Sequence, residues 1–213
     1  MASALQRARA VARAQLEKTT RLANHDALTS LPNRTLLADR LRQGLNRCER
    51  HQEMLGLCFI DLDHFKEIND TLGHDMGDRL LQEVGQRLVS CVRECDTVAR
   101  QGGDEFTALL PNISNTEDIH VITEKILAEL RKPFVLGETQ FLATTSIGIA
   151  VYPDNSTTAE DLIRCADMAM YQVKAHGKNG ALAFQPDMHT AHLDRLSLEN
   201  DLRKAVKEGD QFE

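Results

Sequence analysis

Two pairs of acidic residues in this sequence each follow a segment that predicts a β-strand. Asp61 and Asp63 come after a compact apolar run, and Asp104 and Glu105 come after two adjacent glycines. If the first strand lies beside the hairpin that the glycines predict, Asp61 and Asp104 meet at one end of a sheet. Paired carboxylates suit Mg²⁺, a hard cation that prefers carboxylate and phosphate oxygens. The pattern suits a phosphoryl-transfer site with one or two metal ions, but solvated acids in an ordinary turn have the same spacing and are the commoner explanation for it.

Glycines and lysines complement these acids in a way that suits a bulky anionic ligand. Gly102 and Gly103 let the backbone approach such a ligand closely, and adjacent glycines also favour a hairpin turn. Lys174 and Lys178 stand four residues apart at the end of a predicted helix, where they could meet triphosphate oxygens. Lysines at a helix C-terminus also stabilise the helix dipole, and this pair taken alone favours that explanation.

Hydrophobic periodicity and turn residues predict the elements that must position these side chains. Helices are predicted over about 34–50, 65–72, 78–92, 117–130 and 159–175. Strands are predicted over 54–60, on both sides of the glycine pair within 96–110, as two strands joined at Gly137 and Glu138 within 134–152, and over 181–184. Hairpins, or helices packed on one face, join most of these strands. The pattern predicts an α+β domain with a mainly antiparallel sheet.

Composition limits the function classes. A chain of 213 residues with 42% hydrophobic content can form one sizeable domain with an extra helix at each end. The sequence has no apolar run of about 18 residues, the length that spans a bilayer. The 5 cysteines form no Cys-x-x-Cys pair, which favours reduced thiols and a cytoplasmic domain over disulfides or zinc. A net charge of −7 argues against nucleic acid as a partner, but local cations, backbone amides and a metal can still hold a nucleotide.

Several ordered motifs resemble those of the GGDEF family of diguanylate cyclases. The motifs read RQGGDEF at 100–106, FIDLDHFKEIND at 59–70, GHDMGD at 73–78, DALTSLPNR at 26–34, TSIGIA at 145–150, ADMAMY at 166–171 and GKN at 177–179. Together they cover about residues 24–185, the expected extent of a GGDEF domain. A GGDEF string alone would be a far weaker signal than this ordered set.

The resemblance implies both a fold and a reaction. The fold is a five-stranded, mainly antiparallel sheet flanked by helices, similar to the nucleotidyl cyclases and the polymerase palm. In the reaction the 3′-OH of one GTP attacks the α-phosphate of another, and cyclic di-GMP and pyrophosphate form with Mg²⁺, or Mn²⁺, as cofactor. The implied metal ligands are Asp61, the carbonyl of Leu62, Asp104 and Glu105. Asp104 is also implied as the base that takes the 3′-OH proton, and Glu105 as a second carboxylate beside it.

The same resemblance assigns residues to the substrate. Asn69, His74 and Asp78 would line the guanine pocket, and an Asp carboxylate there selects guanine, because adenine lacks the matching pair of donors. Space for GTP and contacts to its phosphates would come from the backbone amides of Phe65 and Lys66, from Gly102 and Gly103, and from the side chains of Lys66, Lys174 and Lys178.

Catalysis in this family requires two domains, because each holds one GTP and the product forms between them. The resemblance therefore implies an antiparallel homodimer. It also implies an inhibitory site for cyclic di-GMP at Arg93 and Asp96, an RxxD pattern shortly before the signature. A local salt bridge that ends the preceding helix is the alternative explanation for this pair.

Both ends of the sequence suggest a longer protein. Residues 1–23 predict a linker helix, which suggests an upstream sensor and leaves room for membrane attachment through segments not present here. Residues 186–213 resemble a linker and the first helix of an EAL phosphodiesterase domain, so a tandem GGDEF–EAL parent is expected. A simple amphipathic C-terminal helix is the alternative for this tail.

Two other functions compete with the cyclase. The domain could be a silent module that binds GTP or cyclic di-GMP and regulates an attached EAL domain, but such modules usually lose the signature acids that this sequence keeps. Nucleic-acid polymerisation is disfavoured, because the chain is acidic and lacks a basic groove.

Overall fold

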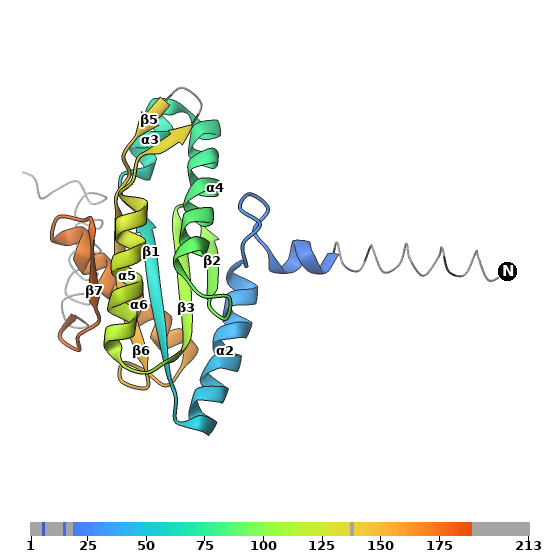
Figure 1. Cartoon of the computed structure of the whole chain (residues 1–213), viewed down its shortest axis with the longest axis vertical. Helices are drawn as coiled ribbons and strands as arrows, with labels where there is room; N and C mark the ends of the chain where they lie inside the picture. Colours follow the sequence, from blue (N-terminus) through green and yellow to red (C-terminus); the bar gives the residue numbers. More distant parts are fainter. Residues whose placement is uncertain (1–5, 7–14, 16–18, 137–138, 189–213) are drawn as a thin grey trace, which may run out of the picture.

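The fold is built on a five-stranded sheet with the strand order β2-β3-β1-β6-β7 (Figure 1). A computed structural model describes residues 6, 15, 19–136 and 139–188. The strands of this sheet are β1 (Met54–Leu62), β2 (Thr97–Gly102), β3 (Glu105–Ile113), β6 (Thr145–Tyr152) and β7 (Gly180–Ala183). Neighbouring strands are antiparallel, except that β6 and β7 are parallel. This sheet confirms the predicted α+β class and its mainly antiparallel strands.

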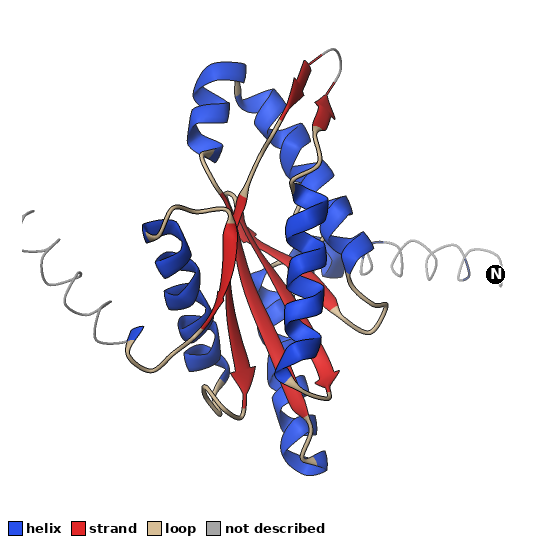
Figure 2. Cartoon of the chain, turned by 60° about the vertical axis from the view of Figure 1, so that its left-hand side comes forward, coloured by secondary structure: helices blue, strands red, loops and turns tan. Residues whose placement is uncertain are grey.

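Helices cover both faces of the sheet (Figure 2). They are α2 (Arg34–His51), α3 (Phe65–Leu72), α4 (His74–Cys91), α5 (Thr116–Leu130) and α6 (Ala159–Ala175). One hydrophobic core lies between the sheet and α4 and α5, and a second lies between the sheet and α2 and α6. Along β1, Cys58 and Ile60 belong to the first core, whereas Leu57 and Phe59 belong to the second. Since successive strand residues point to opposite faces and a core covers each face, β1 is buried on both sides, and its residues 54–60 form an apolar run.

The structure corrects the predicted start of α4. The helix begins at His74, not at residue 78. Gly73 ends α3 with a φ of 85°, and the amides of Met76 and Gly77 donate to its carbonyl oxygen, so a new helix starts at once. The first residues of α4, His74 and Asp75, are exposed. Apolar periodicity could therefore not reveal this first turn.

Two strand predictions also change. β1 runs through Leu62 and not only to residue 60, so Asp61 and Leu62 lie in the strand and not in the loop after it. The region 134–152 holds three strands: β4 (Phe134–Leu136) and β5 (Thr139–Phe141) form a small separate sheet, and β6 follows. The predicted junction at Gly137 and Glu138 lies outside the described residues. The prediction failed because the apolar pattern hides the break at 142–144, where the chain enters the main sheet.

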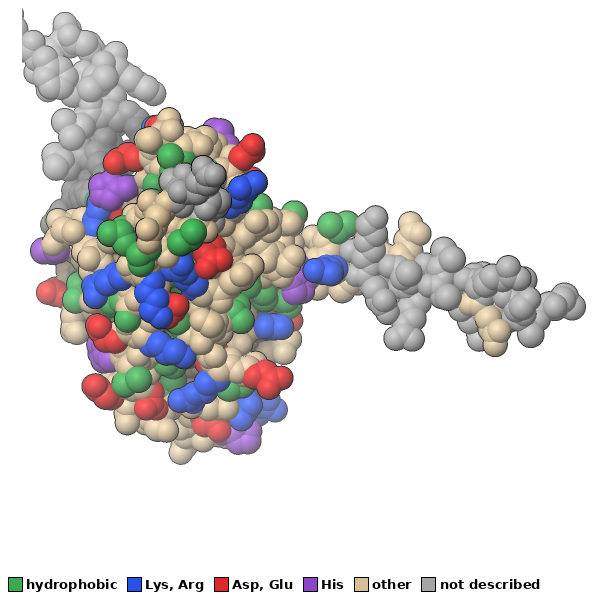
Figure 3. Space-filling model, turned by 45° about the horizontal axis from the view of Figure 1, so that its top comes forward, with side chains coloured by type: hydrophobic (Ala, Val, Ile, Leu, Met, Phe, Trp, Pro, Cys, Tyr) green, Lys and Arg blue, Asp and Glu red, His purple; other side chains and the backbone are tan. Residues whose placement is uncertain are grey.

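The predicted terminal segments lie mostly outside the described residues. Residues 19–24 are helical, whereas most of the linker helix at 1–23 and the tail from 189 onward are not described. Among the helices that are described, none combines the length and the apolar character needed to cross a membrane. On the face drawn in Figure 3, basic and acidic side chains are interspersed and form no patch of one sign.

Candidate active site

The two acidic segments meet where β1 and β3 lie side by side. Asp61 is the cross-strand partner of Glu105 in the antiparallel register. One residue further, the amide of Leu62 donates to the carbonyl oxygen of Asp104 at 3.4 Å. The structure thus brings together all four residues that the sequence assigned to the metal. The convergence depends on the β2–β3 hairpin, whose turn delivers Asp104 to the end of β1.

Asp61 sits in a concentrated negative field. Its side chain is only 7% exposed, and Oδ1 accepts from the Nζ of Lys174 at 2.7 Å. Burial raises the pKa of Asp61 to about 6, and the charges of Asp104 and Glu105 act in the same direction, against the opposing effect of Lys174. Burial also raises the pKa of Glu105, aided by Asp167 and Asp104. A divalent cation would relieve this repulsion.

Lys174 reaches Asp61 because α6 packs unusually close to β6. A Cβ atom at Gly148 would lie 1.9 Å from the Ala166 carbonyl oxygen and 2.2 Å from the Met170 nitrogen, both in the backbone of α6. Only glycine permits this approach. Lys174 lies one helical turn beyond Met170, so the close packing carries its ammonium group to the end of β1.

The donor set fits a magnesium ion that shares its ligands with a substrate. Within the described part of the chain, no three Asp, Glu, His or Cys side chains gather into a complete metal-binding group. Mg²⁺ rarely needs such a cage, because it is usually held by one or two carboxylates together with waters and substrate phosphates. The cross-strand pair Asp61 and Glu105 provides two carboxylates of the required kind.

An opening segment of the chain holds the signature turn in place. The Arg100 guanidinium donates to the Gly103 carbonyl oxygen from Nε at 3.0 Å and from Nη2 at 2.7 Å, and from Nη1 to Asp26 Oδ1 at 2.9 Å. The same Asp26 oxygen accepts from the amide and the hydroxyl of Thr29 at 2.8 and 2.7 Å. Burial opposes ionisation of Asp26, but the bonds from Thr29 and Arg100 outweigh it and lower the pKa of that carboxyl. Both motifs stood out in the sequence, but their direct contact became visible only in the structure.

The glycine pair forms the turn itself. Gly102 has a φ of 144° and Gly103 a φ of 54°, and a Cβ atom at either position would point into open space. Backbone conformation therefore favours glycine here, while the open space leaves room for a ligand.

The candidate guanine-binding residues lie where α3 meets α4. Asn69 belongs to α3, and His74 and Asp78 belong to the first turns of α4. A Cβ atom at Gly77 would lie 2.0 Å from the Asn69 Oδ1, so the Asn69 side chain rests directly on α4, beside the residue that precedes Asp78. The small residue at this position leaves room for the Asn69 amide against α4.

The candidate phosphate-binding residues gather at the start of α3. Phe65 and Lys66 form its first turn, where backbone amides lack intrahelical partners, and no side chain caps this end. Lys178, from the turn after α6, reaches the same place and donates from Nζ to His64 Nε2 at 3.0 Å. These groups suit an anion.

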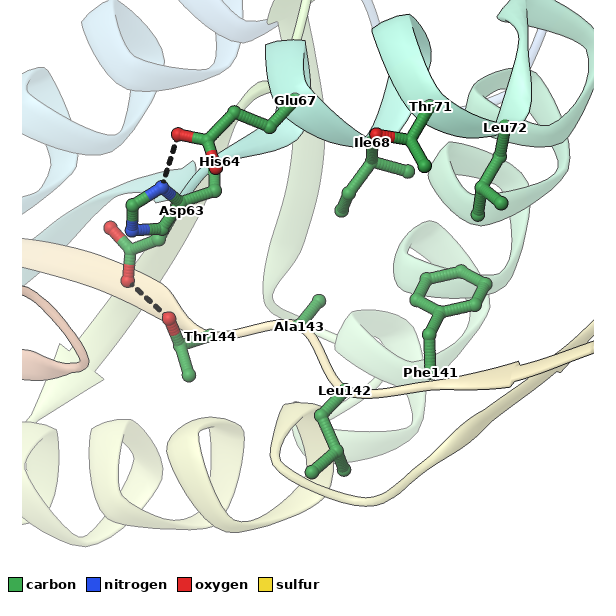
Figure 4. Close-up of a pocket in the computed structure, with 10 residues that line it drawn as sticks. All are labelled: Asp63, His64, Glu67, Ile68, Thr71, Leu72, Phe141, Leu142, Ala143 and Thr144. Atoms are coloured by element: carbon green, nitrogen blue, oxygen red, sulfur yellow. Dashed lines mark hydrogen bonds and ion pairs between the residues drawn. The ribbon is translucent and has the colours of Figure 1, made fainter.

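Asp63, which the sequence paired with Asp61, has a different role. It is 3% exposed. Its carboxylate accepts from the Ser146 hydroxyl at 2.7 Å, the Thr144 hydroxyl at 2.7 Å and the Asn179 amide at 3.0 Å (Figure 4 shows the Thr144 bond). Asp63 therefore ties segments together, and the predicted acidic pair at the end of β1 is reduced to Asp61.

Arg93 and Asp96 form the turn between α4 and β2. Asp96 Oδ2 accepts from the Arg93 amide at 2.8 Å, and the Asp96 amide donates to the Arg93 carbonyl oxygen at 3.1 Å. The contact that ends the helix thus uses the Arg93 backbone, and the Arg93 side chain is exposed. A cavity of about 630 Å³ lies beside Asp96, and Arg40 and Arg47 of α2 are among its lining residues.

Comparisons with known proteins identify the family of this chain. A sequence model described as "Diguanylate cyclase, GGDEF domain" matches residues 23–180. The bifunctional diguanylate cyclase/cyclic di-GMP phosphodiesterase MucR of Pseudomonas aeruginosa is 40% identical over 200 residues, which are 94% of this chain and 29% of MucR. Other curated relatives are named cyclic di-GMP phosphodiesterases. The chain therefore spans less than a third of the length of these relatives.

Solved structures show the same fold. The GGDEF domain of TpbB from Pseudomonas aeruginosa matches with a TM-score of 0.78 at 39% identity, covering 79% of this chain and 99% of that one. The coiled coil and GGDEF domain of DgcB from Caulobacter crescentus, in complex with c-di-GMP, matches with a TM-score of 0.77 at 28% identity, covering 85% and 96%. The chain belongs to the GGDEF family of diguanylate cyclase domains.

Proposed function

We propose that this domain is a diguanylate cyclase that condenses two GTP molecules into cyclic di-GMP and two pyrophosphates. The observation that carries the proposal is the meeting of Asp61 and Glu105 on adjacent strands, with Asp104 bonded to β1 through its carbonyl oxygen. The Lys174 ammonium beside Asp61 adds a cation at the same place. Membership of a family that generally uses divalent metal ions supports the assignment.

The acidic residues hold the metal and move the proton. Asp61, the Leu62 carbonyl, Asp104 and Glu105 would hold Mg²⁺ or Mn²⁺, which supplies charge stabilisation at the phosphates. The 3′-oxygen of one GTP bonds to the α-phosphorus of the other, the bond from that phosphorus to the bridging oxygen of pyrophosphate breaks, and Asp104 accepts the 3′-OH proton. The same exchange in the opposite direction closes the ring.

The remaining residues select and orient GTP. Asn69, His74 and Asp78 recognise the guanine, and the Asp78 carboxylate accepts from its N1–H and N2–H₂ groups. The phosphates are held by Phe65 and Lys66 at the start of α3, beside the glycine turn at 102–103, and by Lys174 and Lys178. Lys174 holds Asp61 in the present structure, and we expect it to turn to the phosphates once a metal ion takes its place.

Catalysis requires two copies of the domain, each with one bound GTP, facing each other. Upstream sensor and downstream EAL domains of a longer parent would control this pairing in the cytoplasm, where the substrate is found. Product inhibition through Arg93 and Asp96 is supported by the exposed Arg93 side chain and by the DgcB complex with c-di-GMP. We expect Arg93→Ala to weaken inhibition by cyclic di-GMP while the initial rate is retained; unchanged inhibition would refute the assignment.

The alternative is a silent module that binds GTP or cyclic di-GMP and regulates an attached EAL phosphodiesterase. The relatives that are named phosphodiesterases favour it. The presence of Asp61, Asp104 and Glu105 favours the cyclase, because catalysis is what requires these acids.

The deciding experiment incubates the chain with GTP and Mg²⁺ at high protein concentration and measures pyrophosphate and cyclic di-GMP. The cyclase predicts two pyrophosphates for each cyclic di-GMP, and neither product from Asp104→Asn, which keeps the size of the side chain. If calorimetry shows that wild type binds GTP but no pyrophosphate appears at any protein concentration, the silent module is correct.

A further inference from the structure

The turn between α6 and β7 holds Lys178 in a backbone conformation that lysine rarely adopts. Gly177, Lys178 and Asn179 have φ values of 110°, 64° and 51°. Positive φ is ordinary for glycine but uncommon for a lysine, and such conformations persist only where surrounding contacts determine them. Contacts from other parts of the fold must therefore hold this turn.

Two residues from other parts of the chain form hydrogen bonds with Asn179. Arg131, just after α5, donates from Nε to Asn179 Oδ1 at 2.9 Å and from Nη2 to the Asn179 carbonyl oxygen at 3.2 Å. Asp63, in the loop after β1, accepts from the Asn179 amide at 3.0 Å. The side chain, the carbonyl and the amide of Asn179 are thus all bonded.

Asp63 is itself a fixed anchor. Its carboxylate also accepts from the hydroxyls of Thr144 and Ser146, and it is buried. Figure 4 shows it beside His64, at the point where the loop from β1 enters α3. The bond from Asp63 to Asn179 therefore fixes the turn relative to the loop that precedes α3 and presents its first amides.

The consequence falls on Lys178, the residue before Asn179. Its Nζ lies 3.0 Å from His64 Nε2, and His64 Nδ1 lies 2.6 Å from Glu67 Oε1. Without the hydrogen bonds to Asn179, the turn would be free to relax to negative φ, and the Lys178 side chain would leave the start of α3.

We propose that Arg131 and Asp63 are positioning residues that fix Lys178 for the triphosphate of GTP. The inference rests on the proposed function, since it assigns a cause to the placement of one phosphate-binding lysine. Arg131 acts through Asn179 and not by contact with the nucleotide. The sequence offers no signal for this role, because residue 131 is 48 positions away from Asn179.

The test compares Arg131→Met with Lys132→Met in the 213-residue chain. Lys132 is the adjacent exposed cation, and its side chain pairs with Glu129, so its replacement removes the same charge but leaves the turn intact. Binding is measured by calorimetry with Mg²⁺ for two nucleotides: GMP, and a GTP analogue with a methylene group between the α- and β-phosphorus atoms. We expect Arg131→Met to weaken binding of the analogue roughly tenfold and to leave the affinity for GMP unchanged. Lys132→Met should change neither affinity.

A double-mutant cycle separates positioning from a general loss of structure. In a Lys178→Met background, Arg131→Met should cause no further loss of analogue affinity, because the positioned group is already absent. In the metal- and nucleotide-free protein, Arg131→Met should also speed hydrogen exchange at the amides of residues 178 and 179 in particular.

Additive losses in the cycle, equal losses for GMP and the analogue, or wild-type affinity in Arg131→Met would each overturn the positioning role while the cyclase proposal stands. A wild-type chain that binds neither nucleotide would overturn the proposed function, and the assignment of Lys178 with it. The exchange measurement still reports in that case whether Arg131 holds the turn.

Discussion

Asp61 and Asp63 stand two residues apart, yet their surroundings give them opposite tasks. Asp61 faces Glu105 and the Lys174 ammonium, in a place where negative charges accumulate. Asp63 accepts hydrogen bonds from Thr144, Ser146 and Asn179, which join three segments of the chain. Burial is similar for both carboxylates, so the partners, and not the burial, separate the site from the scaffold.

The raised pKa of Asp61 predicts that the metal-free protein loses folding stability as the pH rises. The pKa is about 6 in the fold against a usual value of 3.8, so the folded state binds this proton more tightly than the unfolded state. The contribution to stability is therefore greatest below pH 3.8 and is lost as the pH rises through about 6. With chelator present, the free energy of unfolding of wild type relative to Asp61→Asn should fall by up to roughly 3 kcal/mol between pH 4 and 7. Urea denaturation measures it; a constant difference across this range would contradict the assignment.

Removal of Asp63 should damage the fold more than removal of Asp61. Asp63→Ala leaves two hydroxyls and the Asn179 amide without their common acceptor, which should cost about 2–3 kcal/mol of unfolding free energy. Asp61→Ala is the matched control, because Lys174 is partly exposed and can be solvated instead. Equal losses in chemical denaturation would show that the two carboxylates do not differ in this way.

At the scale of elements, close contacts between backbones decide where functional side chains lie. Gly148 lets α6 approach β6, and Gly77 lets Asn69 rest on α4. The two glycines differ in what an added methyl group would strike. At Gly148 it would strike the backbone of α6, whereas at Gly77 it would strike only side chains, the Asn69 amide most closely and the edge of the Phe65 ring next.

Gly77→Ala should therefore impair the site and spare the fold. The methyl group displaces the Asn69 amide, while alanine favours the helix by up to about 1 kcal/mol. We expect unchanged or higher stability and a loss of roughly tenfold or more in GTP affinity, because a guanine contact is removed. Gln86→Ala, an exposed change in the same helix, should keep wild-type affinity in the same titration. Unaltered GTP binding by Gly77→Ala would place guanine recognition elsewhere.

The sequence predicted most elements, because their signals are local. The apolar run from residue 54 predicted β1, and the adjacent glycines predicted the β2–β3 turn. The first turn of α4 escaped prediction because its exposed residues carry no apolar period. Two contacts could not be predicted, because they join distant segments through side chains. They are the bond from Arg100 to Asp26 and the bond from Arg131 to Asn179. Motif resemblance named the site residues, but only the sheet register showed that Asp61 opposes Glu105.

At the scale of the whole molecule, the proposed reaction exceeds what one domain provides. One acidic site at one end of one sheet holds a single GTP in the proposed mechanism, so two copies must face each other. The chain covers less than a third of the length of MucR and of the relatives named phosphodiesterases, and in the proposed mechanism segments beyond it would control pairing. Pairing then acts through effective concentration and not through a change in the chemistry.

Specific activity should therefore depend on protein concentration. Below the dissociation constant of the dimer, turnover per domain should rise in proportion to concentration. Fusion of a dimerising coiled coil to the N-terminus should remove this dependence and raise activity at low concentration. Pyrophosphate release over a dilution series measures both, with a monomeric helix fusion as control. Constant specific activity in a chain shown to be monomeric by light scattering would contradict the two-domain mechanism.

The most direct test of the account is a crystal structure with Mg²⁺ and the methylene-bridged GTP analogue. We predict a metal ion bound by Asp61 and Glu105, phosphates between it and the start of α3, guanine against Asn69 and Asp78, and Lys174 turned from Asp61 to the phosphates. A nucleotide bound elsewhere, or bound with Lys174 still paired to Asp61 and no metal at the acids, would contradict it.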